Sequence, residues 1–226
     1  MMKKIFYFLG NIITMIAAFI IYSFVQQFYF YPFKLKKRLG LTSSSFVILV
    51  LAITIITLLL IFFLYRMQLK QSNKWNYNSR PHWHFKKILI ALLGTFMLII
   101  ASAVVQFALG LGLEQTSTNQ NLLDQISHQS GYFYPVMVII VGPMFEELIF
   151  RGLFFNTFFK ENNKLNKWLG IILSGFIFGY VHDPGLTKYI LVYWALGCVL
   201  AWVYTTTRDL RYSMLSHMLF NSLGFV

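Results

Sequence analysis

Four residues with acid, base or amide side chains lie in or beside apolar stretches near the end of the chain: Glu146, His182, His217 and Asn221. A charge at the middle of a bilayer costs roughly 2.5 to 3.5 kcal/mol on insertion scales, so an intramembrane carboxylate indicates either a compensating partner or a function. One glutamate and two histidines are the groups needed to hold and deprotonate a water molecule, and an asparagine can donate to the oxyanion formed when a peptide carbonyl is attacked. The cluster predicts the catalytic site of a protease within the membrane.

A second carboxylate, next to the first, has a partner on its own helix. Glu147 and Arg151 are four residues apart, so they share one helical face, where an ion pair can neutralise both charges. Glu146 points about 100 degrees away from Glu147, because each helical residue advances by that angle. We interpret Glu147 and Arg151 as supporting residues. For Glu146, His182 and His217 the alternative is a polar network that holds helices together, although their concentration in one third of the chain favours a site.

Membrane helices must position these residues, because a chain with 58% hydrophobic and 12% charged residues cannot build a water-soluble surface. About 20 consecutive apolar residues span a bilayer as a helix. The sequence therefore predicts an all-α fold, a polytopic membrane helix bundle of about seven transmembrane segments, of which the fifth and seventh are the shortest. The predicted segments are Ile5 to Phe30, Ser45 to Tyr65, Ile88 to Leu113, Tyr132 to Phe159, Trp168 to Val181, Tyr189 to Thr205 and Tyr212 to Val226.

A polar loop divides the chain within this single membrane domain. Residues 67–87 are rich in Asn, Ser and Lys and contain no long apolar run. We expect them to separate the N-terminal membrane segments and their basic cytoplasmic loop, residues 1–87, from a helical core with the motifs, residues 88–226. His82 and His84 flank Trp83 in this loop, and we interpret them as neighbours of an interfacial aromatic belt rather than as metal ligands.

The distribution of cations predicts an orientation. By the positive-inside rule the loop 67–87 and residues 160–167 are cytoplasmic, whereas the loop 114–131, which has no Lys or Arg, is extracytoplasmic. The four cations in residues 34–38 contradict this rule if the first two segments both cross the membrane. Either the first segment is not a simple crossing, or the more basic second loop outweighs these four cations.

The formal net charge of +12 does not indicate nucleic-acid binding. The cations lie in short loops between apolar segments, where anionic membrane lipids are the expected partner. The chain has a single cysteine, Cys198, in an apolar run, so a disulfide framework is excluded. The abundance of Ile, Phe, Lys and Asn is typical of an AT-rich bacterium, and we expect the protein to be integral to a bacterial plasma membrane.

These motifs resemble those of the CAAX proteases and bacteriocin-processing enzymes, also called the Abi family of intramembrane proteases. The family's first motif, two adjacent glutamates separated by three residues from an arginine, is matched by residues 146–151. Its second motif, Phe-x-x-x-His, is matched by Phe178 and His182, and its last, His-x-x-x-Asn, by His217 and Asn221. The resemblance covers roughly residues 132–226, and the first three segments carry no motif.

The resemblance implies a role for each matched residue. Glu146 with His182 would activate a water molecule, while His217 and Asn221 would complete the site by binding a metal ion or the oxyanion. A divalent metal such as zinc, held by Glu146, His182 and His217, is compatible with the donor types, and so is a metal-free glutamate mechanism. A His-Glu-x-x-His zinc motif is absent from the sequence. The supporting residues are Glu147, Arg151 and Phe178.

The predicted function is hydrolysis of a peptide bond in a peptide or membrane-anchored protein. One alternative is a non-catalytic bacteriocin immunity or membrane scaffold protein, in which the polar cluster only holds helices together. Another is a proton-coupled transporter, because an intramembrane carboxylate with histidines is also a proton relay, although paired broken helices are missing.

Other intramembrane protease types do not match the sequence. A rhomboid-like serine site requires Gly two residues before the serine, and Ile172 precedes Ser174 in this way. The paired aspartates of a presenilin-like protease are also missing, since Asp124, Asp183 and Asp209 fall in loops or at segment ends.

Overall fold

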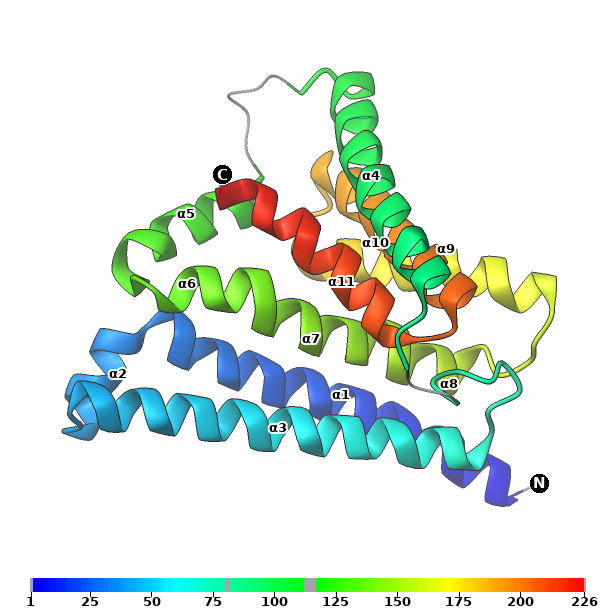
Figure 1. Cartoon of the computed structure of the whole chain (residues 1–226), viewed down its shortest axis with the longest axis horizontal. Coiled ribbons are helices and arrows are strands. Elements are labelled where there is room, and N and C mark those ends of the chain that lie inside the picture. The colour runs from blue at the N-terminus through cyan, green and yellow to red at the C-terminus, as the bar shows by residue number, and fades with distance from the viewer. Residues whose placement is uncertain (1, 80–81, 112–116, 226) are drawn as a thin grey trace.

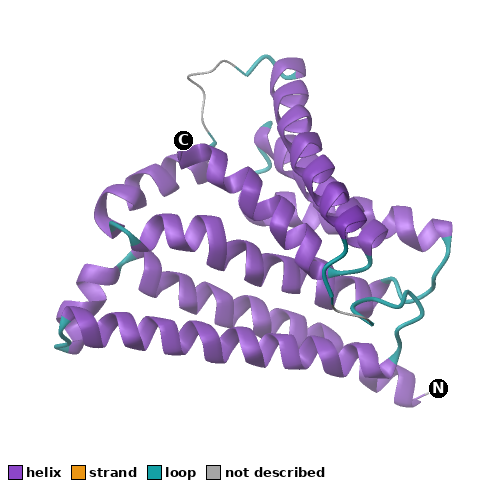
Figure 2. Ribbon diagram, viewed as in Figure 1, coloured by secondary structure: helices purple, strands orange, loops and turns teal. Residues whose placement is uncertain are grey.

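The structure, a computed structural model, describes residues 2–79, 82–111 and 117–225, and every regular element within these ranges is helical. Long helices joined by short loops make up the molecule (Figures 1 and 2). The predicted all-α membrane helix bundle is therefore confirmed. The predicted ends of the third and seventh segments, Leu113 and Val226, lie outside the described residues.

Every predicted segment corresponds to a helix or to a run of helices. Six are single helices: α1 (Met2–Phe30), α3 (Ser43–Gln71), α4 (Phe85–Ala108), α9 (Lys164–His182), α10 (Tyr189–Thr207) and α11 (Leu210–Ser222). By length and composition, five stretches of the described chain can cross a membrane, and they are Ile5–Phe30, Ser43–Gln71, Phe85–Ala108, Phe133–Phe158 and Tyr189–Thr207. Helices α9 and α11 are not among the five, and they correspond to the two segments predicted to be shortest.

The fourth segment is one continuous, irregular helical rod. It consists of α6 (Phe133–Val136), η1 (Met137–Val141), α7 (Gly142–Glu147), η2 (Leu148–Leu153) and α8 (Phe154–Phe158), of which η1 and η2 are π-helical. Insertions of π-helix into an α-helix often accompany functional sites. Here the two π-helical parts flank α7, the element that ends with both glutamates of the first motif.

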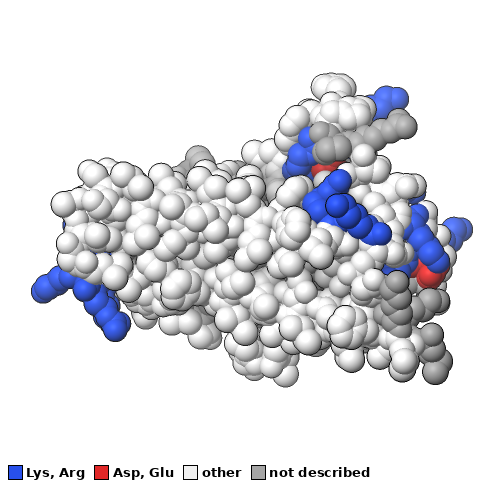
Figure 3. Space-filling view, turned by 90° about the horizontal axis from the view of Figure 1, so that it is seen from below, with Lys and Arg blue, Asp and Glu red and all other residues white. Residues whose placement is uncertain are grey.

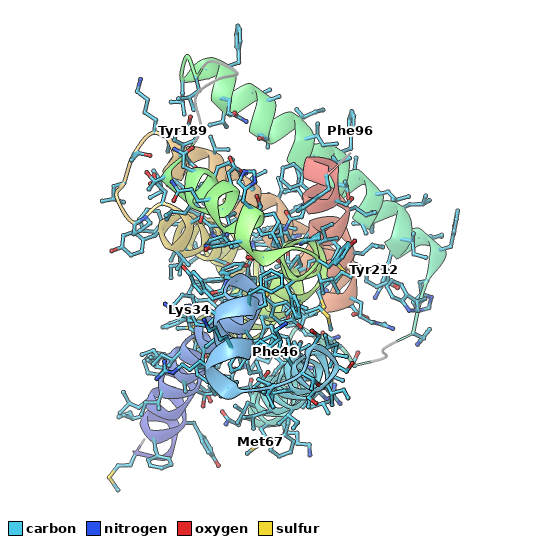
Figure 4. All side chains as sticks on the ribbon, turned by 90° about the vertical axis from the view of Figure 1, so that its left-hand side faces the viewer. Lys34, Phe46, Met67, Phe96, Tyr189 and Tyr212 are labelled. Atoms are coloured by element: carbon cyan, nitrogen blue, oxygen red, sulfur yellow. The ribbon has the colours of Figure 1, made fainter. Side chains whose placement is uncertain are left out.

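The rod is the centre of the bundle. Figure 1 shows it between α1, which pairs with α3, and α11, which crosses over α7. Helix α10 packs against both α9 and α4, on the other side of the rod from α3 (Figure 4). The most apolar 18-residue window of the rod is 56% buried, compared with 17% in α3 and in α4, so the outer helices present their apolar side chains to lipid. Phe96 on α4, for example, points away from the bundle (Figure 4).

The N-terminal helices have the geometry of two full crossings. Helices α1 and α3 run antiparallel side by side, joined through the short helix α2 (Pro32–Leu39) (Figure 1). Helix α2 contacts α5 (Thr118–Ser130), so the cations of residues 34–38 lie at the same end of the molecule as the cation-free loop. Figure 3, which views the molecule of Figure 1 from below, shows Lys and Arg gathered toward the two ends of the molecule, with uncharged surface between them. The structure thus supports a simple crossing by the first segment, and which end is cytoplasmic stays a prediction.

Polar residues before the helices determine where several of them begin. The side chains of Thr42, Ser117, Asn163 and Asp209 each accept a hydrogen bond from a backbone N–H in the first turn of the following helix. Such N-caps satisfy donors that a helix cannot satisfy internally. Because Asn163 caps α9, that helix begins four residues before the predicted start at Trp168.

The loop after α3 is packed more tightly than its polar composition suggests. The indole N–H of Trp75 donates to the Phe159 carbonyl at 2.8 Å, and the ring of Tyr77 stacks on Tyr204 with centroids 4.4 Å apart. Burial raises the pKa of Tyr77, which keeps its hydroxyl neutral. Trp83, by contrast, is exposed, as expected for an interfacial aromatic residue. The loop therefore fastens the ends of α3, α8 and α10 to one another.

Asn78 is the central residue of this loop, and its replacement tests the packing. Its side-chain oxygen accepts from the Tyr65 hydroxyl at 2.8 Å, and its amide donates to Asp209 at 3.2 Å. Its backbone has a φ of 47°, in the left-handed region that asparagine tolerates better than alanine. Asn78→Ala leaves buried polar groups unpaired and strains the backbone, so we expect a loss of about 1 to 3 kcal/mol and a lower melting temperature in detergent. The exposed Asn162 is the matched control, and equal melting temperatures for Asn78→Ala and Asn162→Ala would contradict the prediction.

Candidate active site

The Glu146 carboxylate is the chemical centre of the site. It lies near the end of α7, and its two oxygens have different surroundings. Oε1 accepts a hydrogen bond from the Tyr22 hydroxyl at 2.6 Å. Oε2 faces the two histidines, at 3.7 Å from His217 Nε2 and 4.0 Å from His182 Nε2. The three side chains come from α7, α9 and α11, so the structure brings together the groups that the sequence predicted to act together.

His182, the last residue of α9, has a fixed tautomer. Its Nδ1 lies 2.8 Å from the Phe178 carbonyl oxygen, which can only accept, so Nδ1 carries the proton. The neutral ring then presents the Nε2 lone pair toward Glu146. Two aromatic rings hold the imidazole in place, because Phe178 lies 4.2 Å and Tyr193 5.1 Å from it, centroid to centroid.

His217 on α11 is oriented by the second glutamate of the first motif. Its Nδ1 lies 3.1 Å from Glu147 Oε1, and it donates its proton there because the carboxylate accepts. When the ring is neutral, the Nε2 lone pair of His217 therefore also points toward Glu146. This contact could not be predicted from the sequence, because the two residues are 70 positions apart on different helices.

Glu147 and Arg151 form the ion pair that their spacing predicted. The distance between Arg151 Nη1 and Glu147 Oε1 is 3.1 Å, and both side chains are completely buried. Arg151 Nη2 donates to the Gly197 carbonyl at 2.8 Å, and its guanidinium lies over the Phe178 ring at 4.8 Å from the centroid. The pair thus connects the rod to α9 and α10, in addition to holding His217.

Asn221 lies at the rim of the same site, with one amide proton in use. Its Nδ2 donates to the Val138 carbonyl in η1 at 2.8 Å. An asparagine amide has two N–H groups, so a second donor remains for another acceptor. The expected role of Asn221 as an oxyanion donor stays a prediction.

The carboxylate and both histidines line a cavity of about 950 Å³ between the rod, α1, α9 and α11. Residues of α5 form another part of its wall. Most of the lining is apolar or aromatic, and Glu146, His182, His217 and Asn221 supply a compact polar area within it. Such a combination is typical of sites for small molecules or peptide segments.

Comparisons with known proteins agree with these motifs. The family model described as "Type II CAAX prenyl endopeptidase Rce1-like" matches residues 128–223, which contain all three motifs. The "UPF0177 protein YaiF" of Lactococcus lactis is 34% identical over 157 residues, which cover 67% of this chain and 67% of that protein. The chain belongs to the CAAX protease family. No solved structure matches it.

Two further relatives of the family are named as peptidases. The "Putative membrane peptidase YdiL" of Bacillus subtilis is 32% identical over 142 residues, which cover 60% of this chain and 54% of that protein. The "Membrane-embedded CAAX protease MroQ" of Staphylococcus aureus is 33% identical over 148 residues, covering 62% of this chain and 58% of that protein. The chain thus spans little more than half of the length of these two relatives. All three relatives are bacterial, in agreement with an integral membrane protein of a bacterium.

The site of this family member has suitable donor types for a metal ion, but not the spacing. Two Nε2 lone pairs and one carboxylate oxygen converge, and each histidine donates its other N–H to an oxygen, as metal-binding histidines commonly do. Within the described ranges, however, no group of three His, Cys, Asp or Glu side chains is arranged to hold a metal ion. Zinc at Glu146, His182 and His217 therefore stays a prediction.

The N-terminal region contributes a residue that the sequence analysis missed. Tyr22 on α1 reaches Glu146, although the first three segments carry no family motif. The signal in the sequence is faint: Tyr22 and Gln26 are four residues apart in an apolar run, which puts two polar groups on one face of the helix. The division at residue 87 stays a prediction, and the site itself includes side chains from both parts.

The buried ion pair can be tested by removing its cation. Arg151→Leu leaves the Glu147 carboxylate buried without its partner, so we expect a loss of about 3 to 5 kcal/mol and a large drop in melting temperature in detergent. Lys74→Leu is the matched control, because Lys74 pairs with Glu161 at an exposed position, where such a pair contributes about 1 kcal/mol or less. If the two variants melted at the same temperature, the buried pair would not be needed for stability.

Proposed function

We propose that this protein is an intramembrane endopeptidase that hydrolyses a peptide bond of a membrane-associated protein or peptide. The observation that carries the proposal is the convergence of Glu146 Oε2 with the two histidine Nε2 atoms, at 3.7 and 4.0 Å, inside a cavity of about 950 Å³. Membership of the CAAX protease family and the names of two bacterial relatives support it.

Glu146 acts as the general base in the proposed mechanism. Distances of 3.7 to 4.0 Å are too long for direct hydrogen bonds but leave room for a water molecule that contacts Oε2 and a histidine together. Water donates one proton to Oε2 and the other to an Nε2 lone pair. This arrangement directs the lone pairs of the water oxygen away from the three acceptors, toward a substrate carbonyl in the cavity.

The reaction then proceeds by addition and elimination. A bond forms between the water oxygen and the carbonyl carbon while Glu146 takes the proton, and the carbonyl oxygen becomes an oxyanion. The second amide N–H of Asn221 donates to that oxyanion. Glu146 returns the proton to the amide nitrogen as the C–N bond breaks, which releases the amine and the new carboxylic acid. The acid then gives its proton to the amine, which leaves a carboxylate and an ammonium group.

Replacement of the base gives the direct test. We expect Glu146→Gln to lower kcat by at least about 100-fold, because an amide cannot accept the proton, and His182→Ala to lower it strongly as well. The measurement is cleavage of a library of apolar peptides by purified protein in lipid nanodiscs, with products identified by mass spectrometry.

The control for this test is Glu161→Gln, which removes an exposed carboxylate outside the cavity. We expect it to cleave like the wild-type protein. Full cleavage by well-folded Glu146→Gln would reject the proposed function and favour a polar network that only holds helices together.

Zinc binding is tested separately by metal analysis of the purified protein. If Glu146 acts without a metal, we expect less than one zinc ion per chain and unchanged cleavage after dialysis against a chelator. One zinc ion per chain, lost in His182→Ala, together with cleavage that a chelator abolishes and zinc restores, would instead support the metal-dependent mechanism.

A further inference from the structure

We propose that Tyr22 on α1 is a positioning residue that holds the Glu146 carboxylate in its reactive orientation, an inference that rests on the proposed function. Tyr22 lies outside residues 128–223, which the family model matches. Helix α1 would therefore be part of the catalytic machinery, and not only a membrane anchor.

The hydrogen bond between the two side chains has a defined direction. The Tyr22 hydroxyl lies 2.6 Å from Glu146 Oε1, within the range of bonds from a hydroxyl to a carboxylate. Gln26 Nε2 donates to the same hydroxyl oxygen at 3.1 Å. Since a hydroxyl has one proton, and its oxygen already accepts from Gln26, Tyr22 donates that proton to Glu146.

The tyrosine ring is itself held in place. It stacks on Phe145, the residue before Glu146, with centroids 5.1 Å apart and ring planes inclined by 21°. Gly142 lies one helical turn earlier, and a Cβ at this position would be 3.4 Å from the Tyr22 hydroxyl and 3.7 Å from Glu146 Oε1. These are ordinary van der Waals distances, so Gly142 borders both polar groups.

This contact determines which carboxylate oxygen meets the histidines. With Oε1 bound to Tyr22, Oε2 is the atom that faces His182 and His217. No other described hydrogen bond fixes the Glu146 carboxylate. Without the tyrosine proton, the carboxylate is free to rotate, and the base spends less time beside the water that it must deprotonate.

The test compares two buried tyrosines of the same helix. Tyr22→Phe removes the hydroxyl that reaches Glu146, whereas Tyr29→Phe removes one that bonds Thr54 at 2.9 Å, away from the cavity. We expect Tyr22→Phe to lower kcat about 10- to 100-fold with KM within about twofold of the wild-type value, because orientation of the base affects the chemical step. Tyr29→Phe should keep both constants while changing the melting temperature by a similar amount.

Two further variants separate positioning from stability. Gln26→Leu keeps the tyrosine hydroxyl but removes its donor, so we expect a smaller fall in kcat than in Tyr22→Phe, and this variant decides the question if Tyr22→Phe does not fold. Tyr22→Phe combined with Glu146→Gln should lose no more activity than Glu146→Gln alone, because Tyr22 acts only through the carboxylate.

The outcomes distinguish this inference from the proposed function. An inactive Glu146→Gln with Tyr22→Phe at the wild-type kcat would overturn the positioning role and leave the peptidase intact. An equal loss of kcat in Tyr22→Phe and Tyr29→Phe would also overturn it, since the effect would then be structural. Full activity of Glu146→Gln would overturn the proposed function itself.

Discussion

The buried ion pair between Glu147 and Arg151 is the interaction on which the rest of the site depends. Two charged groups with no exposure to water are stable only if each has a partner and further hydrogen bonds. The arginine obtains one from the Gly197 carbonyl of α10, and the glutamate one from His217 of α11. These contacts therefore bring three helices to one place, and they also turn the His217 ring toward the cavity.

The two adjacent glutamates have separate tasks because consecutive residues of a helix point in different directions. Glu147 faces the protein interior, where it is neutralised, whereas the neighbouring Glu146 faces the cavity and meets a tyrosine and two histidine nitrogens. One carboxylate thus organises the bundle, and the other is available for chemistry. A single turn of one helix accommodates both without placing two like charges against each other.

Sequence reasoning succeeded where the relevant partners lie within one helix or follow from composition. The seven apolar segments and the Glu147–Arg151 pair could be predicted from apolar length and from four-residue spacing. The motifs also placed Glu146, His182 and His217 in one site. Other contacts between helices could not be predicted, and these include Tyr22 with Glu146 and His217 with Glu147. Periodicity shows which face of a helix a residue occupies, but not which helix covers that face. The packing of the polar loop after α3 could not be predicted for the same reason, because the carbonyl that Trp75 contacts is 84 residues away in the sequence.

The π-helical parts of the central rod have a consequence for how the bundle keeps its alignment. Each contains a carbonyl that accepts from a side chain of another helix: Val138 in η1 from Asn221 of α11, and Phe150 in η2 from Ser174 of α9. These two bonds lie on opposite sides of the glutamates along the rod. A shift of the rod along its own axis by one residue would break both hydrogen bonds at once. The two bonds therefore hold the glutamates at a defined depth in the bundle.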